Sequence, residues 1–184
     1  MIIMKPTDFI PKFDAYLAQK KLAFQGVIIG ATALNLLGTV TRETMDCDVL
    51  DPTIPQDILK AATDFARLEK IPESALKENW FNNGPIDVAK YLPDGWRARV
   101  VPVFQGKALK LFTLGRHDLL CSKLDALCAR ATDFNDCVAM KPTPVELQNC
   151  FEWVCERDAN PEWPVHVESE FKRLARKLGY EFQA

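Results

Sequence analysis

Two aspartates and one glycine in the first third of the chain have the residue types and spacing of a metal–nucleotide site. Asp46 and Asp48 are separated by one residue in an apolar segment, and Gly30 ends the preceding apolar run. Alternate residues of a strand project to the same face, so both carboxylates can bind one hard divalent cation through oxygen. Glycine at a strand end lets a phosphate approach the backbone closely. The pattern predicts a nucleoside triphosphate bound with Mg²⁺ or Mn²⁺.

The residues between Gly30 and the aspartates offer further phosphate contacts. Thr32 begins a short predicted helix whose free N–H groups would point at the phosphates, and its hydroxyl could bond a phosphate or cap the helix. An Arg42-x-Thr44 step then leads into Asp46. Arg42 could hold a phosphate in its fork of N–H donors, or pair with a neighbouring acid as an ordinary loop arginine. The plain alternative for the two aspartates is that both face solvent at the end of an edge strand.

A second polar constellation falls inside the helical pattern of residues 122–136. Lys123, Arg130 and Asp133 lie near one helix face at offsets of seven and three residues. A lysine and an arginine on one face can bracket a triphosphate, with aspartates behind them to orient the cations. The alternative is a solvated helix face that carries salt bridges.

The intervening region, residues 71–97, is rich in proline, glycine and asparagine and is predicted to be mostly loop with a short helix. Trp80, Asn82 and Asn83 could stack on a base or hydrogen-bond to it, although a loop tryptophan is more typical of a lid over the core. Asp87 could be a third carboxylate of the site or an ordinary turn residue.

Composition restricts the class of protein. The 184 residues are 48% apolar and 26% charged with a net charge of −2, which is typical of a globular domain and gives no overall basic field for nonspecific nucleic-acid binding. No apolar run is long enough to span a membrane, and the N-terminus lacks the features of a signal peptide. Six cysteines without a CxxC pair, and the isolated His117 and His166, do not have zinc-ligand spacing. They predict reduced thiols in a cytoplasmic protein.

Hydrophobic periodicity predicts an α+β fold, with a small mixed β-sheet, helices packed on it and a C-terminal helical extension. We expect an α/β core over residues 1–115 and a helical region over residues 116–184. Thr143, followed by Pro144 and Glu146, predicts a capped helix start. The predicted helices are 7–22, 32–37, 56–68, 118–130 with a further turn toward 138, 143–156 and 165–178. The predicted strands are 23–29, 47–50, 97–104 and 108–114, the last two joined by a hairpin turn at 105–107.

Together the two constellations resemble the motifs of the nucleotidyltransferase superfold, in the branch of AbiEii-type toxins and related uncharacterised bacterial proteins. The segment G-A-T-A-L-x-L-L-G followed by R-x-T-x-D-x-D is similar to the first motif of that branch. The segment K-L-x-A-x-x-x-R-x-x-D-x-x-D, from Lys123 to Asp136, is similar to the second. The resemblance covers residues 24–137 and implies a small mixed sheet of the nucleotidyltransferase type.

The resemblance implies transfer of a nucleoside monophosphate from an NTP to an acceptor hydroxyl or phosphate on RNA, such as tRNA, or on a protein. It also implies a possible toxin role with a cognate antitoxin as partner. In-line attack between two metal ions is the expected mechanism. The roles it implies are triphosphate binding by Gly30 and Ala31, Mg²⁺ binding by Asp46 and Asp48, phosphate contact by Lys123 and polar anchoring by Asp136.

Two departures from the family pattern concern catalysis. Ala31 stands where many members have serine or glycine, so one hydroxyl donor to the phosphates is missing. The strand expected at residues 98–103 contains no acid, whereas many active members carry a third carboxylate on a later central strand. The alternative function is therefore a catalytically degenerate relative that binds a nucleotide or a partner protein without turnover.

Overall fold

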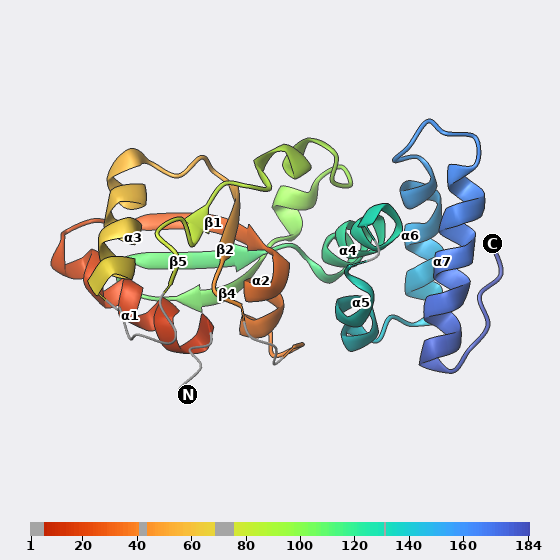
Figure 1. Ribbon diagram of the computed structural model, residues 1–184, viewed down its shortest axis with the longest axis horizontal. Coiled ribbons are helices and arrows are strands. Elements are labelled where there is room, and N and C mark those ends of the chain that lie inside the picture. The colour runs from red at the N-terminus through yellow and green to blue at the C-terminus, as the bar shows by residue number, and fades with distance from the viewer. Residues whose placement is uncertain (1–5, 41–43, 69–75, 131) are drawn as a thin grey trace. The chain divides into compact units, whose positions relative to one another are not determined.

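The computed structural model describes residues 6–40, 44–68, 76–130 and 132–184, and they form two compact units (Figure 1). The first unit consists of the described residues within Met1–Tyr91 and Arg97–Leu114. The second consists of Leu92–Trp96 and the described residues within Gly115–Ala184. None of the described helices combines the length and the apolar character that a bilayer crossing requires.

A five-stranded mixed sheet forms the centre of the first unit within the described residues. Its strand order is β3-β2-β1-β5-β4. β1 pairs in parallel with β5 and antiparallel with β2, β2 pairs in parallel with β3, and β4 pairs antiparallel with β5. The strands are β1 (Phe24–Ile29), β2 (Cys47–Asp51), β3 (Phe81–Asn82), β4 (Val101–Gln105) and β5 (Leu109–Thr113).

Two amphipathic helices supply nine of the 21 described buried residues of the core cluster in this unit. The helices α1 (Pro6–Gln19) and α3 (Gln56–Leu68) pack against each other beside the sheet, and both contribute fully buried side chains to one apolar cluster with it (Figure 1). Phe13 of α1 contacts Phe65 of α3 and Trp80, with ring centroids 5.3 and 5.1 Å away. A third helix, α2 (Gly30–Leu36), begins directly where β1 ends.

The hairpin between β4 and β5 is fixed by one carboxylate of α1. Asp14 accepts hydrogen bonds from the backbone N–H groups of Lys107, Ala108 and Leu109, at 3.2, 2.8 and 2.7 Å. Burial acts to raise the pKa of Asp14, but these three donors and the charge of Lys107 leave its pKa below the ordinary value. The turn closes against this carboxylate, so Gly106 has no room for a side chain there.

Four α-helices build the second unit in its described part. They are α4 (Arg116–Arg130), α5 (Phe134–Met140), α6 (Pro144–Cys155) and α7 (Trp163–Leu178), and each contacts at least two of the others. α6 starts with the expected capping box, in which Thr143 accepts from the Glu146 N–H and Glu146 accepts from the Thr143 N–H. α7 ends at Gly179, which has a φ of 90° and continues the chain in a left-handed conformation.

The predicted α+β class is confirmed, and the helix at 56–68, the hairpin and the capping box occur where the sequence predicts them. The strand predicted at 97–104 is wrong at its start, because Trp96–Arg99 form a 3₁₀ turn (η2) and β4 begins at Val101. β4 is also an edge strand rather than a central one, which is where a strand proline such as Pro102 is tolerated.

We expect Asp14→Ala to lower the free energy of unfolding by about 1–3 kcal/mol, because three backbone donors of the hairpin lose a charged acceptor. The pKa of Asp14 is depressed in the folded state, so its contribution is present above the ordinary carboxyl pKa of 3.8 and is lost as the pH falls through its depressed value. Urea unfolding at neutral and acidic pH measures this. Asp14→Asn, which keeps one acceptor oxygen, should lose less than Asp14→Ala; equal losses would contradict the assignment.

Candidate functional site

Asp48 lies where three elements of the first unit meet, at the beginning of β2. The β2–β3 register places it opposite Asn82, whose side-chain N–H donates to Asp48 Oδ1 at 3.2 Å. Its Oδ2 lies over the first residue of α2: a Cβ added to Gly30 would stand 2.9 Å from that oxygen. Gly30 has a φ of 80°, a conformation that side chains rarely adopt. Glycine is therefore required here both by the backbone and by the approach of the carboxylate.

Asp46 precedes β2 and is held to the same region through its backbone. Thr32, which is buried in α2, donates a hydrogen bond from its hydroxyl to the Asp46 carbonyl oxygen. The Asp46 carboxylate is 44% exposed, and Lys77 Nζ lies 3.8 Å from its Oδ2. The prediction that Thr32 caps α2 is wrong, since Ile29 is the residue at that position. Thr32 instead fixes the segment that carries Asp46.

The cysteine between the two aspartates is not a ligand candidate. Cys47 is fully buried in the core, on the opposite side of the strand from its neighbours in sequence. Burial, with the negative charge of Asp48, raises the pKa of the Cys47 thiol well above its ordinary value. The accessible donors that this segment offers are therefore carboxylate oxygens, which suit hard cations such as Mg²⁺ and Mn²⁺.

The W-F-N-N segment supports the aspartates rather than lining an open base pocket. Trp80 is fully buried, and its indole N–H donates to the Ala62 carbonyl at 3.0 Å, which confirms the interpretation as a core residue. Asn83 donates to the carbonyls of Val49 and Pro52 and accepts from the N–H of Ile54, so it ties down the loop after β2. Sequence reasoning did not detect β3, because a strand of two residues carries no periodicity.

The structure describes Ala31 and Thr44, two of the other predicted phosphate contacts of this unit. Ala31 is half-buried in the first turn of α2, and Thr44 is half-buried in the coil before β2. Arg42 lies outside the described residues. The structure therefore brings Gly30, Ala31 and Thr32 to the segment that carries Asp46 and Asp48.

A third carboxylate does not join the pair within the part of the chain that the structure describes. No group of three His, Cys, Asp or Glu donors within 4.8 Å of one another includes Asp46 or Asp48 there. Asp87 is exposed and pairs with Lys90 at 2.6 Å in the 3₁₀ helix η1 (Ile86–Lys90), which fits an ordinary turn residue. On the side of β1 away from β2 lies β5, whose sequence LKLFT also contains no acid.

Lys123 sits in a buried ionic cluster of the second unit. Its Nζ donates to Asp133 Oδ1 at 2.7 Å and to Asp136 Oδ2 at 2.8 Å, and the exposed Arg130 lies 3.5 Å from Asp133. The Lys123 side chain is 9% exposed, so the interpretation as a solvated helix face is wrong for this lysine. Burial acts to raise the pKa of Asp133, but the hydrogen bond and charge of Lys123 leave it below the ordinary value. The ion pairs of this cluster hold the start of α5 against α4.

A cleft of about 150 Å³ opens on the sheet of the first unit, over strands β1 and β5. Its walls are mostly apolar, and none of the predicted nucleotide-binding residues lines it. The lining residues are Gln25, Gly26, Val27, Asp51, Pro52, Val100 and Phe112. The cleft is therefore separate from the group formed by Gly30, Asp46 and Asp48.

Comparison with known proteins gives one informative match. A model of the family described as "nucleotidyltransferase of unknown function" (DUF6036) matches residues 10–141. The matched range begins in α1 and ends just after α5, so it includes Gly30, both aspartates and Lys123. No curated protein and no solved structure matches the chain.

Gly30→Ala and Gly38→Ala form a matched pair, because both glycines have positive φ but only Gly30 faces Asp48. We expect each to lose about 1–2 kcal/mol of stability from the left-handed backbone. Only Gly30→Ala should displace the Asp48 carboxylate and shift the NMR signals of the Asn82 side-chain amide. Unchanged Asn82 signals in Gly30→Ala would show that the carboxylate is not held against the glycine.

Lys123→Met should lower the free energy of unfolding by about 3–5 kcal/mol, because it leaves two buried carboxylates without their cation. The matched control is Arg130→Met, which removes an exposed partner of Asp133 and should cost only about 0–1 kcal/mol. Urea unfolding of both variants measures the difference. Similar losses in the two variants would contradict a buried ionic anchor.

Proposed function

Because the chain belongs to the family described as a nucleotidyltransferase of unknown function, we propose that it transfers a nucleoside monophosphate from an NTP to an RNA or protein acceptor with Mg²⁺ or Mn²⁺. In this reaction an acceptor oxygen forms a bond to the α-phosphorus of the NTP. The bond from that phosphorus to the bridging oxygen breaks, pyrophosphate leaves, and the acceptor proton passes to solvent or to a base. Catalysis of this type rests on positioning and charge stabilisation.

The observation that carries the proposal is the placement of the Asp48 carboxylate between Asn82 and Gly30. The Asn82 amide, which is an uncharged donor, hydrogen-bonds to Oδ1 of Asp48, and the side-chain-free face of Gly30 accommodates Oδ2. The neighbouring Asp46 has a carboxylate that solvent reaches and a backbone held by Thr32. This donor set consists of oxygen and fits a hard cation.

Asp46 and Asp48 are the residues that would hold the cation, which when bound neutralises charge on the triphosphate. Gly30 and Ala31 remain the proposed triphosphate contacts from their place in the sequence motif; the face of Gly30 that lacks a side chain is taken by Asp48 Oδ2, so a phosphate would have to meet the backbone elsewhere at the start of α2. Thr32 acts by positioning Asp46, since its hydroxyl hydrogen is engaged there. Arg42 and Thr44 remain proposals from their place in the sequence motif.

Lys77 is a further candidate that the sequence motifs did not point to. Its ammonium lies 3.8 Å from Asp46 Oδ2, and its side chain is 67% exposed. A weak, exposed ion pair of this kind costs about 0–1 kcal/mol to break. Lys77 can therefore release Asp46 to a cation and turn its own charge toward a phosphate at little cost.

The three predicted site residues of the second unit, Lys123, Arg130 and Asp136, differ in how easily a phosphate could reach them. Lys123 and Asp136 already satisfy each other inside the second unit, so phosphate contact by Lys123 would require an exchange of partners. Arg130, which is largely exposed, is the more accessible cation of the three. The nature of the acceptor, a toxin role and a cognate antitoxin rest on the resemblance to AbiEii-type toxins.

A second candidate function is binding of a nucleotide or a partner protein without turnover. It is favoured by the lack of a third acid beside Asp46 and Asp48 among the described residues. Many active relatives use such a residue to activate the acceptor or to hold a second cation. Where the second candidate binds a nucleotide, it differs from the first only in that no label is transferred.

Incubation with each α-labelled NTP, Mg²⁺ or Mn²⁺, total tRNA and cell protein should transfer label to one acceptor class. We expect Asp48→Asn to reduce the rate by at least about 100-fold, because weakened cation binding removes several kcal/mol of charge stabilisation and each 1.36 kcal/mol is tenfold. Asp57→Asn, at the first turn of α3, is the matched control and should keep the rate.

Folding of each variant is checked by its unfolding temperature, so that loss of rate is not loss of fold. Label on no acceptor, together with cation-dependent NTP binding that Asp48→Asn abolishes, would replace the enzyme by the nucleotide-binding candidate. Neither binding nor transfer would overturn both.

A further inference from the structure

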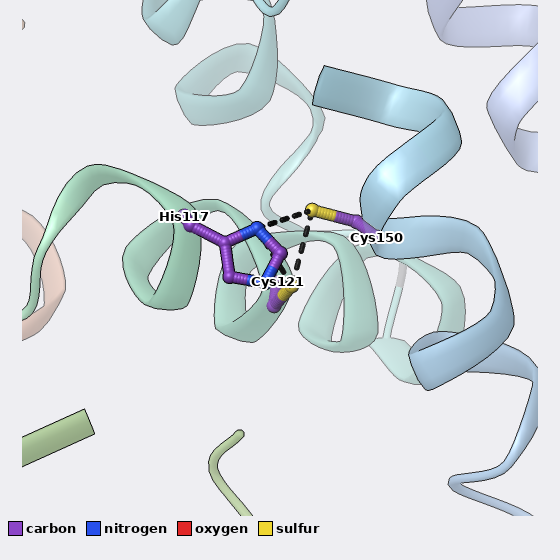
Figure 2. A group of neighbouring side chains, drawn as sticks. All are labelled: His117, Cys121 and Cys150. Atoms are coloured by element: carbon purple, nitrogen blue, oxygen red, sulfur yellow. Dashed lines mark hydrogen bonds between the residues drawn. The ribbon is translucent and has the colours of Figure 1, made fainter. Parts of the chain in front are cut away.

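One histidine and two cysteines of the second unit converge, although one of the cysteines is 29 residues from the other. The prediction that His117 is isolated from other ligand residues is therefore wrong. His117 and Cys121 lie one turn apart on α4, and Cys150 faces them from α6 (Figure 2). The two sulfurs are 3.0 Å apart. Nδ1 of His117 lies 4.0 Å from the sulfur of Cys121 and 3.8 Å from that of Cys150, and Nε2 lies 3.7 Å from the sulfur of Cys121. A single ring nitrogen is thus nearly equidistant from both sulfurs.

These distances are close to those of a tetrahedral zinc site. Two thiolates and one imidazole on zinc place the sulfurs about 3.7 Å apart and each sulfur about 3.5 Å from the nitrogen. The two nitrogen–sulfur distances of the cluster exceed that value by about 0.3 and 0.5 Å. The sulfurs would have to separate by about 0.7 Å, which small rotations of two cysteine side chains supply.

The donor set and its surroundings also favour a thiophilic cation. Thiolate and imidazole ligands select zinc-class metals, whereas carboxylates select Mg²⁺ and Ca²⁺. Within the described residues, these three form the one group of at least three His, Cys, Asp or Glu donors that lie within 4.8 Å of one another. We propose that His117, Cys121 and Cys150 bind one zinc-class divalent cation, with a water molecule as the fourth ligand.

Access to the site comes from the histidine side. His117 is exposed, whereas Cys121 and Cys150 are fully buried. A cation can therefore enter beside the imidazole and reach the sulfurs from there. Three protein ligands and an open fourth position are the coordination that zinc takes where water or another small ligand has access.

Glu146 lies one turn before Cys150 on α6, and its charge acts on the Cys150 thiol. Its carboxylate is engaged by the Arg116 guanidinium and by the Thr143 N–H. The hydrogen bond from Arg116, opposed by burial and aided by Thr143, holds the pKa of Glu146 at about 2. Glu146 is therefore ionised near the site, where its charge favours a cation without coordinating it.

Binding requires both thiols to lose their protons to solvent, because thiolates are the ligands. In the protein without a cation, the thiol of Cys121 donates to the sulfur of Cys150. That hydrogen bond, together with burial, raises the pKa of Cys150. The cation would replace this hydrogen bond and link α4 to α6. Cys150 lies outside residues 10–141 that match the family, and the inference does not depend on the proposed function.

The test uses the full chain, reduced and freed of metal by a chelator, and titrates it with Zn²⁺ without oxygen. We expect one Zn²⁺ per chain and a rise in unfolding temperature. Co²⁺ in its place should give thiolate-to-metal charge-transfer absorption and the intense visible bands of a tetrahedral site. His117→Ala should weaken Zn²⁺ binding by more than about 100-fold, since loss of a residue that only supports a ligand already costs about 10–100-fold.

The matched controls are His166→Ala, which removes the other exposed histidine, and Cys155→Ser, which removes a partly exposed cysteine of α6. Both should keep the affinity of the unmodified chain. His117 is exposed, so its replacement should leave the fold intact. The proposal is overturned by absence of stoichiometric Zn²⁺ uptake, by a Co²⁺ spectrum without thiolate bands, or by unchanged affinity in His117→Ala. A chain that takes up no metal but forms a Cys121–Cys150 disulfide in air would identify a redox pair instead.

Discussion

The buried side chain of Trp80 connects the elements on which the candidate site of the first unit is built. Its ring packs edge-on against two phenylalanines of α1 at centroid distances of 5.2 and 5.1 Å. Its indole N–H donates to Ala62 of α3, and its carbonyl accepts from the N–H of Cys47 at 2.6 Å. The ring contacts and the satisfied N–H together hold the indole in place. The next two residues, which form β3, therefore pair with β2, and this pairing places Asn82 beside Asp48.

The sequence predicts best those elements that are stabilised by contacts between residues close to each other in the chain. The helix at 56–68 shows its buried stripe in the spacing of its apolar residues. The capping box at Thr143 needs only the residues of one turn. The glycine at 30 and the aspartate at 48 could be named as partners, because two consecutive strands joined by a short helix usually lie side by side in the sheet.

The features that sequence reasoning missed depend on contacts between distant segments. Asn82 is 34 residues from the aspartate to which it donates, and no periodic pattern marks its two-residue strand. His117 and Cys121 have the four-residue spacing of one helix face, a usable signal, but Cys150 joins them only through the packing of α4 on α6. The strand predicted from Arg97 fails for a different, local reason: the alternation of apolar residues cannot show that a 3₁₀ turn precedes Val101.

The acidic groups of the two units differ in what a ligand would have to displace. Asp133 and Asp136 surround the Lys123 ammonium with side chains only 12% and 4% exposed, so a phosphate could reach that lysine only by breaking a buried ionic cluster. Breaking such a pair costs about 3–5 kcal/mol. Asp46, in contrast, is 44% exposed, and its pairing with Lys77 at 3.8 Å is worth about 0–1 kcal/mol. A hydrated cation at the aspartates of the sheet therefore has to displace a much weaker ion pair, whereas the ion pairs of Lys123 hold α5 on α4.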